Sequence, residues 1–316
     1  MGLLQSPHST VAPPLPQTRL QKETRMTASA IYLGGAPDAP LARRILRFPL
    51  TRLLLAVAFF MVPFLLIQGG AMHFFEAKLY SRLGQLLGAV VGCLSYAFYV
   101  IKIEKRAVSE LSIKGAWPEY GAGFAMGGLM VCTVVAGIAV LGGFRVLSMS
   151  PSSLIVLPLT MHVTVGLIEE MLMRGILFRV VQESLGTWLA LAASGLVFGA
   201  MHLVNDNISV LGIANITAAG VLLASAFLLT GRLWLCAGLH AAWNFFQDGI
   251  FSVAVSGHEV KTGLLVSERS GPDWLTGGAF GIEGSAIALA VVVLASGVML
   301  ALAQRRGRMV LPFWKR

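Results

Sequence analysis

The feature that most constrains the fold of this chain is a series of long apolar runs, each close in length to a membrane-spanning helix. Eight such runs follow Arg52, and each is near the ~20 residues that the hydrocarbon core of a bilayer requires. They cover residues 53–70, 83–102, 120–142, 152–172, 187–204, 208–230, 233–251 and 283–303. Because backbone polar groups in lipid must be hydrogen-bonded within the protein, these runs predict helices. The expected fold is an all-α, polytopic transmembrane helical bundle of about eight spans.

Composition excludes two broad classes of protein. Only 12% of the residues are charged and 56% are hydrophobic, whereas about 25% of an ordinary soluble domain is charged. This composition excludes a water-soluble globular protein. The net charge is +9, but the basic residues form no dense cluster interleaved with aromatic residues, so no nucleic-acid partner is expected. Cys93, Cys132 and Cys236 lie inside apolar runs, where packing is expected rather than disulfide formation or metal binding.

The placement of Lys and Arg predicts an orientation. Basic residues gather before the first span, between the second and third spans, and after the last span. An even number of spans puts these three segments on one side, and the positive-inside rule makes that side cytoplasmic. We therefore expect an integral membrane protein, in a bacterial inner membrane, with both termini in the cytoplasm.

Several ionisable or amide side chains interrupt the apolar runs in the second half of the chain. An ionisable residue at the centre of a spanning helix costs about 2.5–3.5 kcal/mol on insertion scales, so it is a functional candidate by default. The residues concerned are Glu169, Glu170 and Arg174 in the fourth span, His202 in the fifth, and His240 and Asn244 in the seventh.

Glu169 and His202 are predicted to lie at one depth in the bundle. The fourth span should continue as helix to about Ser184 and then turn near Gly186. Glu169 lies 17 residues before Gly186, and His202 lies 16 residues after it. At 1.5 Å per residue, both lie about 25 Å from the turn, so the fourth and fifth spans should bring the two side chains together.

Helical spacing separates the roles of the two adjacent glutamates. Glu170 and Arg174 are four residues apart, so they share a helix face and can form an ion pair. Glu169 is turned about 100° from Glu170 and is free to point elsewhere. His240 and Asn244 are also four residues apart and should project in one direction.

Together these groups suggest hydrolytic chemistry. A carboxylate in an apolar site has a raised proton affinity and, beside an imidazole, can act as a general base on water. Glu169 and His202 are candidates for that pair, while His240 and Asn244 offer N–H donors for an oxyanion. The alternative is a metal site, because Glu169, His202 and His240 form the His₂Glu ligand set that catalytic zinc uses. We favour no cofactor, with zinc as the alternative.

The same residues carry a family resemblance. They stand in the strings Glu169-Glu170-Met-Leu-Met-Arg174, Phe198-Gly-Ala-Met-His202 and His240-Ala-Ala-Trp243-Asn244. These strings resemble the EExxxR, FxxxH and HxxxN motifs of the CAAX-protease and bacteriocin-processing family, also called CPBP or Abi. The resemblance covers roughly residues 150–250 and implies an intramembrane endopeptidase similar to type II CAAX prenyl endopeptidases.

The resemblance also implies roles for individual residues. These roles are water activation by Glu169 and His202, an oxyanion hole from His240 and Asn244, and structural support from Glu170, Arg174 and Phe198. A metal-independent glutamate mechanism is favoured, and a metalloprotease is the alternative. The implied partners are the lipid bilayer and a membrane-associated peptide or protein substrate.

Two other functions remain open at this point. The Glu169–His202 pair could be the proton relay of a transporter, although the first four spans do not repeat in the last four as many transporters do. The protein could also be a non-enzymatic membrane scaffold or immunity protein. His162 lies seven residues before Glu169 on the same face. It is expected to pack against a neighbouring helix or bond to it, with a supporting role in the site as the alternative.

The predicted domain organisation follows from these features. It comprises a disordered cytoplasmic tail (1–45), three transmembrane helices (46–145), the catalytic CPBP/Abi helical core (150–250), a non-cytoplasmic loop (252–282), and a last transmembrane helix with a basic cytoplasmic tail (283–316). Translation could begin at Met26 instead of Met1.

Overall fold

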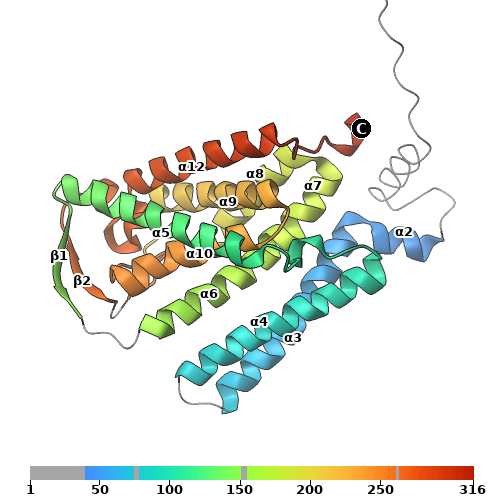
Figure 1. Cartoon of the computed structure of the whole chain (residues 1–316), viewed down its shortest axis with the longest axis horizontal. Helices are drawn as coiled ribbons and strands as arrows, with labels where there is room; N and C mark the ends of the chain where they lie inside the picture. Colours follow the sequence, from blue (N-terminus) through green and yellow to red (C-terminus); the bar gives the residue numbers. More distant parts are fainter. Residues whose placement is uncertain (1–39, 75–77, 151–154, 261–262) are drawn as a thin grey trace, which may run out of the picture.

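The protein is an all-α polytopic helical bundle, as the apolar runs predict (Figure 1). The structure is a computed structural model that describes residues 40–74, 78–150, 155–260 and 263–316. Its helices are α2 (Leu41–Arg47), α3 (Pro49–Phe74), α4 (Lys78–Tyr99), α5 (Ala116–Val140), α6 (Val156–Glu170), α7 (Arg179–Leu185), α8 (Thr187–Met201), α9 (Val210–Thr230), α10 (Trp234–Phe245), α11 (Asp273–Thr276) and α12 (Ala286–Arg305). Two strands, β1 (Phe144–Met149) and β2 (Leu265–Arg269), form an antiparallel pair at one end of the bundle.

Six helical segments among the described residues are long and apolar enough to cross a membrane. They are Pro49–Phe74, Tyr80–Glu104, Ala116–Val140, Val156–Leu185, Val210–Thr230 and Ala286–Arg305. The two other predicted spans also form helices, but α8 has 15 residues and α10 has 12. Helix α10 is enclosed by the rest of the bundle, since every residue from Cys236 to Phe245 is buried.

The fifth span ends earlier than its sequence predicts. We expected it to reach residue 204, but α8 ends at Met201 and a turn begins at His202. The reason is the string Asn205-Asp206-Asn207, whose residue types favour turns. Asn207 has a left-handed backbone with φ of 55°, a conformation that Asn adopts more readily than most residues.

The fourth span continues as helix to Leu185, one residue beyond the prediction. A π-helical segment, Met171–Phe178, joins α6 to α7 directly after Glu170. Such wide turns are rare and often occur at functional sites. The chain then reverses at Gly186, whose φ is +85° and whose missing Cβ would lie 2.7 Å from the Pro312 nitrogen. Only glycine meets both conditions without strain.

The last residues of the segment predicted as a disordered tail are helical. Residues 1–39 lie outside the described residues, but Leu41–Arg47 forms helix α2. The segment Leu-Ala-Arg-Arg-Ile-Leu-Arg consists of good helix formers, which explains the helix. The predicted boundary at residue 45 therefore falls inside an ordered element.

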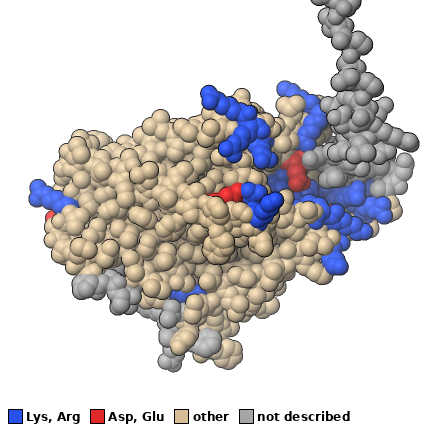
Figure 2. Space-filling model, viewed as in Figure 1, with Lys and Arg blue, Asp and Glu red and all other residues tan. Residues whose placement is uncertain are grey.

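Both ends of the described chain lie at one end of the bundle, near α2 and α7 (Figure 1). On the face that Figure 2 shows, Lys and Arg side chains gather at this same end. A cluster of ion pairs joins α3 and α7 to the segment 104–110 here. Its members are Arg52, Glu104, Arg106, Glu110, Arg179 and Glu183.

Glu110 supplies a test of this ionic cluster. It is 1% exposed and accepts hydrogen bonds from Tyr96 and Arg106. Burial raises the pKa of its carboxyl, but the hydrogen bond and charge of Arg106 outweigh burial and hold that pKa below its usual value. The resulting stabilisation exists above the unfolded-state pKa of about 4.3 and is lost as the pH falls through the folded-state pKa.

We predict that Glu110→Gln lowers the free energy of unfolding by about 1–3 kcal/mol at pH 7. The difference from wild type should shrink as the pH falls below about 4. Thermal melting in detergent across this pH range measures both effects. Glu268→Gln, at an exposed carboxylate on β2, is the control and should melt like wild type at every pH.

Helices α5 and α10 are in direct backbone contact because small residues line their crossing. A Cβ built on Gly123 would overlap the Leu235 carbonyl oxygen, and one on Gly238 would overlap the Tyr120 carbonyl oxygen. Close crossings of this kind are typical of small residues between membrane helices. The crossing fixes the position of α10, which carries two of the predicted site residues.

We predict that Gly123→Ala destabilises the protein by about 1–3 kcal/mol, because the added methyl group must push the two backbones apart. Gly121→Ala on the same helix is the matched control, since nothing lies within 4 Å of its added Cβ. The control should be neutral or stabilising by about 0.5–1 kcal/mol. Equal melting temperatures for the two variants would contradict the close crossing.

Candidate active site

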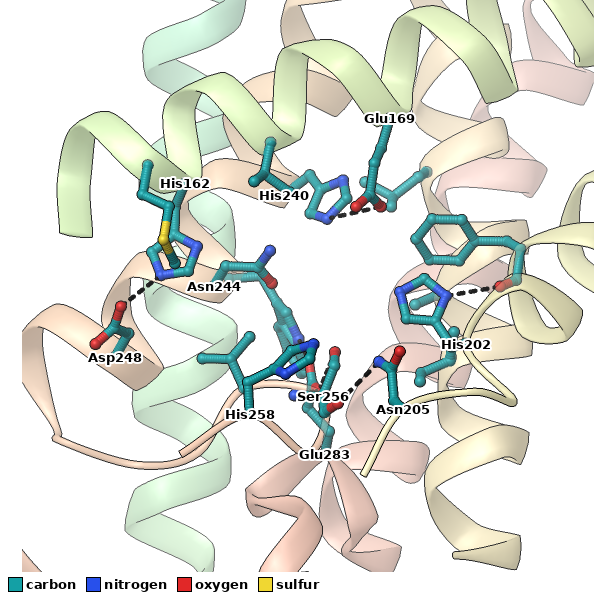
Figure 3. A pocket seen from close by; sticks show the side chains of 18 of the residues that line it. His162, Glu169, His202, Asn205, His240, Asn244, Asp248, Ser256, His258 and Glu283 are labelled. Atoms are coloured by element: carbon teal, nitrogen blue, oxygen red, sulfur yellow. Dashed lines mark hydrogen bonds and ion pairs between the residues drawn. The ribbon is translucent and has the colours of Figure 1, made fainter. Parts of the chain in front are cut away.

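A cavity of about 880 Å³ lies among α6, α8, α9, α10 and the segment 255–260. The side chains of Glu169, His202, His240 and Asn244 all line it, together with Phe198 (Figure 3). The fourth and fifth spans therefore bring Glu169 and His202 to one cavity, as their equal distances from the turn predict. Glu170 and Arg174 lie outside the cavity, fully buried behind it.

Glu170 is the centre of a buried polar network. Its Oε1 atom accepts hydrogen bonds from Arg174 at 2.7 Å and from His240 Nδ1 at 2.8 Å. Arg174 also donates to the Gly220 carbonyl oxygen on α9 at 2.9 Å. The Glu170–Arg174 pair is the one that the i,i+4 spacing predicts, whereas the bond to His240 is not apparent from the sequence. Through this network, Glu170 connects α6, α9 and α10.

The bond to Glu170 also defines the state of His240. A carboxylate can only accept, so Nδ1 of His240 carries a proton. The other ring nitrogen, Nε2, faces the cavity and lies 3.9 Å from Glu169 Oε2. His240 thus has a carboxylate at each ring nitrogen.

Glu169 differs from Glu170 in having an uncommitted carboxylate. Its side chain is 28% exposed and borders the cavity. The 3.9 Å separation from His240 is too long for a direct hydrogen bond. Oε2 of Glu169 is buried, and no described residue donates a hydrogen bond to it. Such a group is poised to accept a proton from a ligand.

His202 is oriented by the backbone of its own helix. Its Nδ1 atom lies 2.8 Å from the Phe198 carbonyl oxygen, and because a carbonyl only accepts, Nδ1 is the donor. In a neutral ring, Nε2 then carries a lone pair. The Phe198 ring lies against His202, with centroids 4.7 Å apart, and 4.9 Å below the guanidinium of Arg174. Phe198 thus packs between the cavity and the buried network.

Comparison with known proteins gives a family match over part of the chain. Residues 151–246 match the family model described as "Rce1-like: Type II CAAX prenyl endopeptidase Rce1-like". The match contains all three motifs, from Glu169 to Asn244. The match supports assignment of the chain to the CPBP family of CAAX proteases. Neither the curated proteins nor the solved structures that were compared with it gave a match.

Two features of the cavity lie beyond the family motifs. Glu283 is buried beside the cavity and accepts from Trp243 Nε1 at 2.6 Å, from Gln247 at 3.1 Å, and from the Ser256 backbone N–H and hydroxyl, both at 2.8 Å. It ties the loop before α12 to α10 and to the cavity wall. The sequence indicated Glu283 only as an acidic residue at the start of an apolar run, between Gly281 and Gly284.

The second feature is a contact of His162. Its Nε2 atom lies 2.8 Å from Asp248 Oδ2, in the π-helical turn Phe246–Ile250 that follows α10. The prediction that His162 packs against or bonds to a neighbouring helix is confirmed, with a π-helical turn as the neighbour. Asp248 itself was missed, because its position shortly after the third motif carries no family signal.

The three side chains of the alternative zinc site do not lie together as metal ligands would. Among the described residues, no group of three or more His, Cys, Asp or Glu side chains is arranged to hold a metal ion. Of Glu169, His202 and His240, the first and third approach each other to 3.9 Å, and both nitrogens of His240 already face carboxylates. The three side chains line one cavity, but they do not form a ligand cluster in this arrangement.

We predict that the two adjacent glutamates differ sharply in their effect on stability. Glu170→Ala leaves Arg174 buried without its partner and should cost about 3–5 kcal/mol of unfolding free energy. Glu169→Ala removes no hydrogen bond from a described residue and should change stability by less than about 0.5 kcal/mol. Melting of both variants in detergent measures the difference, and similar losses would contradict the separation of roles.

Proposed function

We propose that this protein is an intramembrane endopeptidase that hydrolyses a peptide bond of a membrane-associated peptide or protein. The observation that carries the proposal is the uncommitted carboxylate of Glu169, in a cavity that also presents His202, His240 and Asn244. The family assignment supports a CAAX-type protease in general, and the residue roles below are our inference.

The proposed reaction begins with water between Glu169 and His202. The Glu169 carboxylate accepts a proton from water, and Nε2 of His202 accepts a hydrogen bond that orients it. The resulting hydroxide forms a bond to the scissile carbonyl carbon. When the C–N bond breaks, Glu169 returns its proton to the leaving nitrogen, so the products are a carboxylic acid and an amine.

His240 and Asn244 are proposed to stabilise the oxyanion of the tetrahedral intermediate. Asn244 donates from its amide, and His240 donates from Nε2. Because Nδ1 already donates to Glu170, His240 must carry both ring protons to play this role. The carboxylates at its two nitrogens favour that charged form. Glu170 is thus a positioning residue that acts through His240.

We predict that Glu169→Gln and His202→Ala each lower the cleavage rate by at least about a hundredfold. Asn244→Ala should lower it by about a hundredfold to a thousandfold, as removal of an oxyanion donor does. All three should insert and melt like wild type, and Glu268→Gln is the control. Comparison of membrane peptides between cells with wild type and cells with Glu169→Gln identifies the substrate, which should accumulate uncut.

Other outcomes would favour the alternatives. Undiminished cleavage in Glu169→Gln contradicts the proposal. A proton flux in proteoliposomes that depends on Glu169 would favour a transporter, and a cellular phenotype that survives substitution of all four residues would favour a scaffold or immunity protein. Zinc remains the alternative cofactor: metal analysis of active protein tests it, and full activity after chelation supports the metal-independent reaction.

The proposed orientation places both termini in the cytoplasm of a bacterial inner membrane. It is supported by the gathering of Lys and Arg at the end of the bundle that holds α2 and the C-terminus (Figure 2). The bilayer and the membrane-bound substrate are the partners, and no nucleic acid is involved.

A further inference from the structure

A second histidine–carboxylate pair lines the same cavity, two helical turns away from Glu169. It consists of His162 on α6 and Asp248 in the turn after α10, joined at 2.8 Å (Figure 3). The pair resembles the Glu169–His240 pair of the candidate catalytic site, but the residue types are exchanged. There α6 supplies the carboxylate of Glu169, and α10 supplies the imidazole of His240.

The proposed mechanism gives this pair no role, and part of it is open to the cavity. His162 is 2% exposed, and its Nδ1 atom has no hydrogen-bond partner among the described residues. Asp248 has a side chain that is 15% exposed, and only its Oδ2 atom is bonded within the described chain. If the pair only held two helical segments together, the hydrogen bond between His162 and Asp248 Oδ2 would be sufficient. The remaining oxygen of Asp248 can therefore receive a ligand.

The spacing relates this pair to a bound peptide. His162 and Glu169 are seven residues apart on one face of α6, which is about 10 Å along the helix. An extended peptide advances about 3.3 Å per residue. A substrate lying along α6 with its scissile bond at Glu169 would therefore place a side chain about three residues away against Asp248.

The charge of the cavity indicates the chemistry of that side chain. Apart from the histidines, the ionisable residues lining the cavity are four acids and one base, namely Glu169, Asp248, Glu259, Glu283 and Arg82. The carboxylate of Glu283 already accepts four hydrogen bonds, and Arg82 donates to Gln85 at 3.0 Å. In a chain of net charge +9, this is an acidic cavity that attracts a cationic group.

We propose that Asp248, held in place by His162, is a specificity-determining residue that binds a Lys or Arg side chain of the substrate. The bound side chain lies about three residues from the cleaved bond. It donates a charge-assisted hydrogen bond to Asp248 Oδ1, while His162 donates to Oδ2 and acts as a positioning residue. The position relative to the cleaved bond rests on the proposed peptidase function; the binding of a basic side chain does not.

A binding experiment tests the subsite without relying on cleavage. The probes are fluorescent octapeptides of Ala and Ser, palmitoylated at either end, with one Lys, norleucine or Glu moved through every position. The protein carries Glu169→Gln, so that the peptides stay intact, and anisotropy in detergent gives the affinities. At one position, Lys should bind about tenfold to a hundredfold more tightly than norleucine, and Glu should bind more weakly.

The variant Asp248→Asn tests the assignment to this residue. Asparagine keeps the shape and an oxygen for His162 but removes the charge, so the preference for Lys should disappear without a change in melting temperature. Asp248→Glu should restore the preference, and Glu268→Gln should leave it unchanged. Equal binding of the three side chains at all positions, or a preference for Lys that survives Asp248→Asn, overturns the proposal. A lower melting temperature with the preference retained also overturns it, because the pair is then only structural.

Cleavage of the same peptides by wild type separates the two proposals. If Lys binds through Asp248 but no peptide is cut, the subsite stands and the peptidase function fails. If peptides are cut with no dependence on Asp248, the peptidase function stands and the subsite fails. If both hold, cleavage should occur about three residues from Lys.

Discussion

The candidate site depends on one buried carboxylate. Glu170 accepts from Arg174 and from His240, and Arg174 continues the network to the Gly220 carbonyl of α9. In a low-dielectric interior each of these groups would be costly alone, and together they are tolerated because every charge has a partner. The network fixes the rotation of α6 relative to α10, and that rotation points Glu169 into the cavity. The two neighbouring glutamates thus differ in position: Glu170 holds the helices together, and Glu169 faces the cavity.

Much of this could be predicted from the sequence, because membrane helices obey simple rules. Run length predicted the helical bundle, and the distances of Glu169 and His202 from Gly186 predicted that both reach one place. The pairing of Glu170 with Arg174 followed from helical spacing. These predictions depend only on local geometry within one helix or one hairpin.

The remaining features of the site depend on contacts between segments that are distant in the sequence. The spacing of residues within one helix does not predict such contacts. Glu283 and Asp248 reach the cavity from a loop and from a π-helical turn, and neither position has a periodic signal. Run length does not predict the early end of α8, because apolar residues continue through Leu203 and Val204 up to the turn-forming Asn205-Asp206-Asn207. The bond from His240 to Glu170 required the packing of α6 against α10, where a Cβ on Gly166 would lie 3.2 Å from the Ala237 carbonyl oxygen.

The C-terminal tail has a practical consequence for work on this protein. Val310 exchanges hydrogen bonds with Thr187, its carbonyl accepting from the Thr187 backbone at 2.9 Å and its N–H donating to the Thr187 hydroxyl at 2.8 Å. These two hydrogen bonds hold the tail against the Gly186 turn, which joins the helices of Glu169 and His202. A purification tag or fluorescent reporter fused after Arg316 would begin within a few residues of the Val310–Thr187 hydrogen bonds. A fusion made ahead of α2 lies away from these hydrogen bonds. The choice of terminus should therefore decide whether a tagged protein keeps the native hairpin at Gly186.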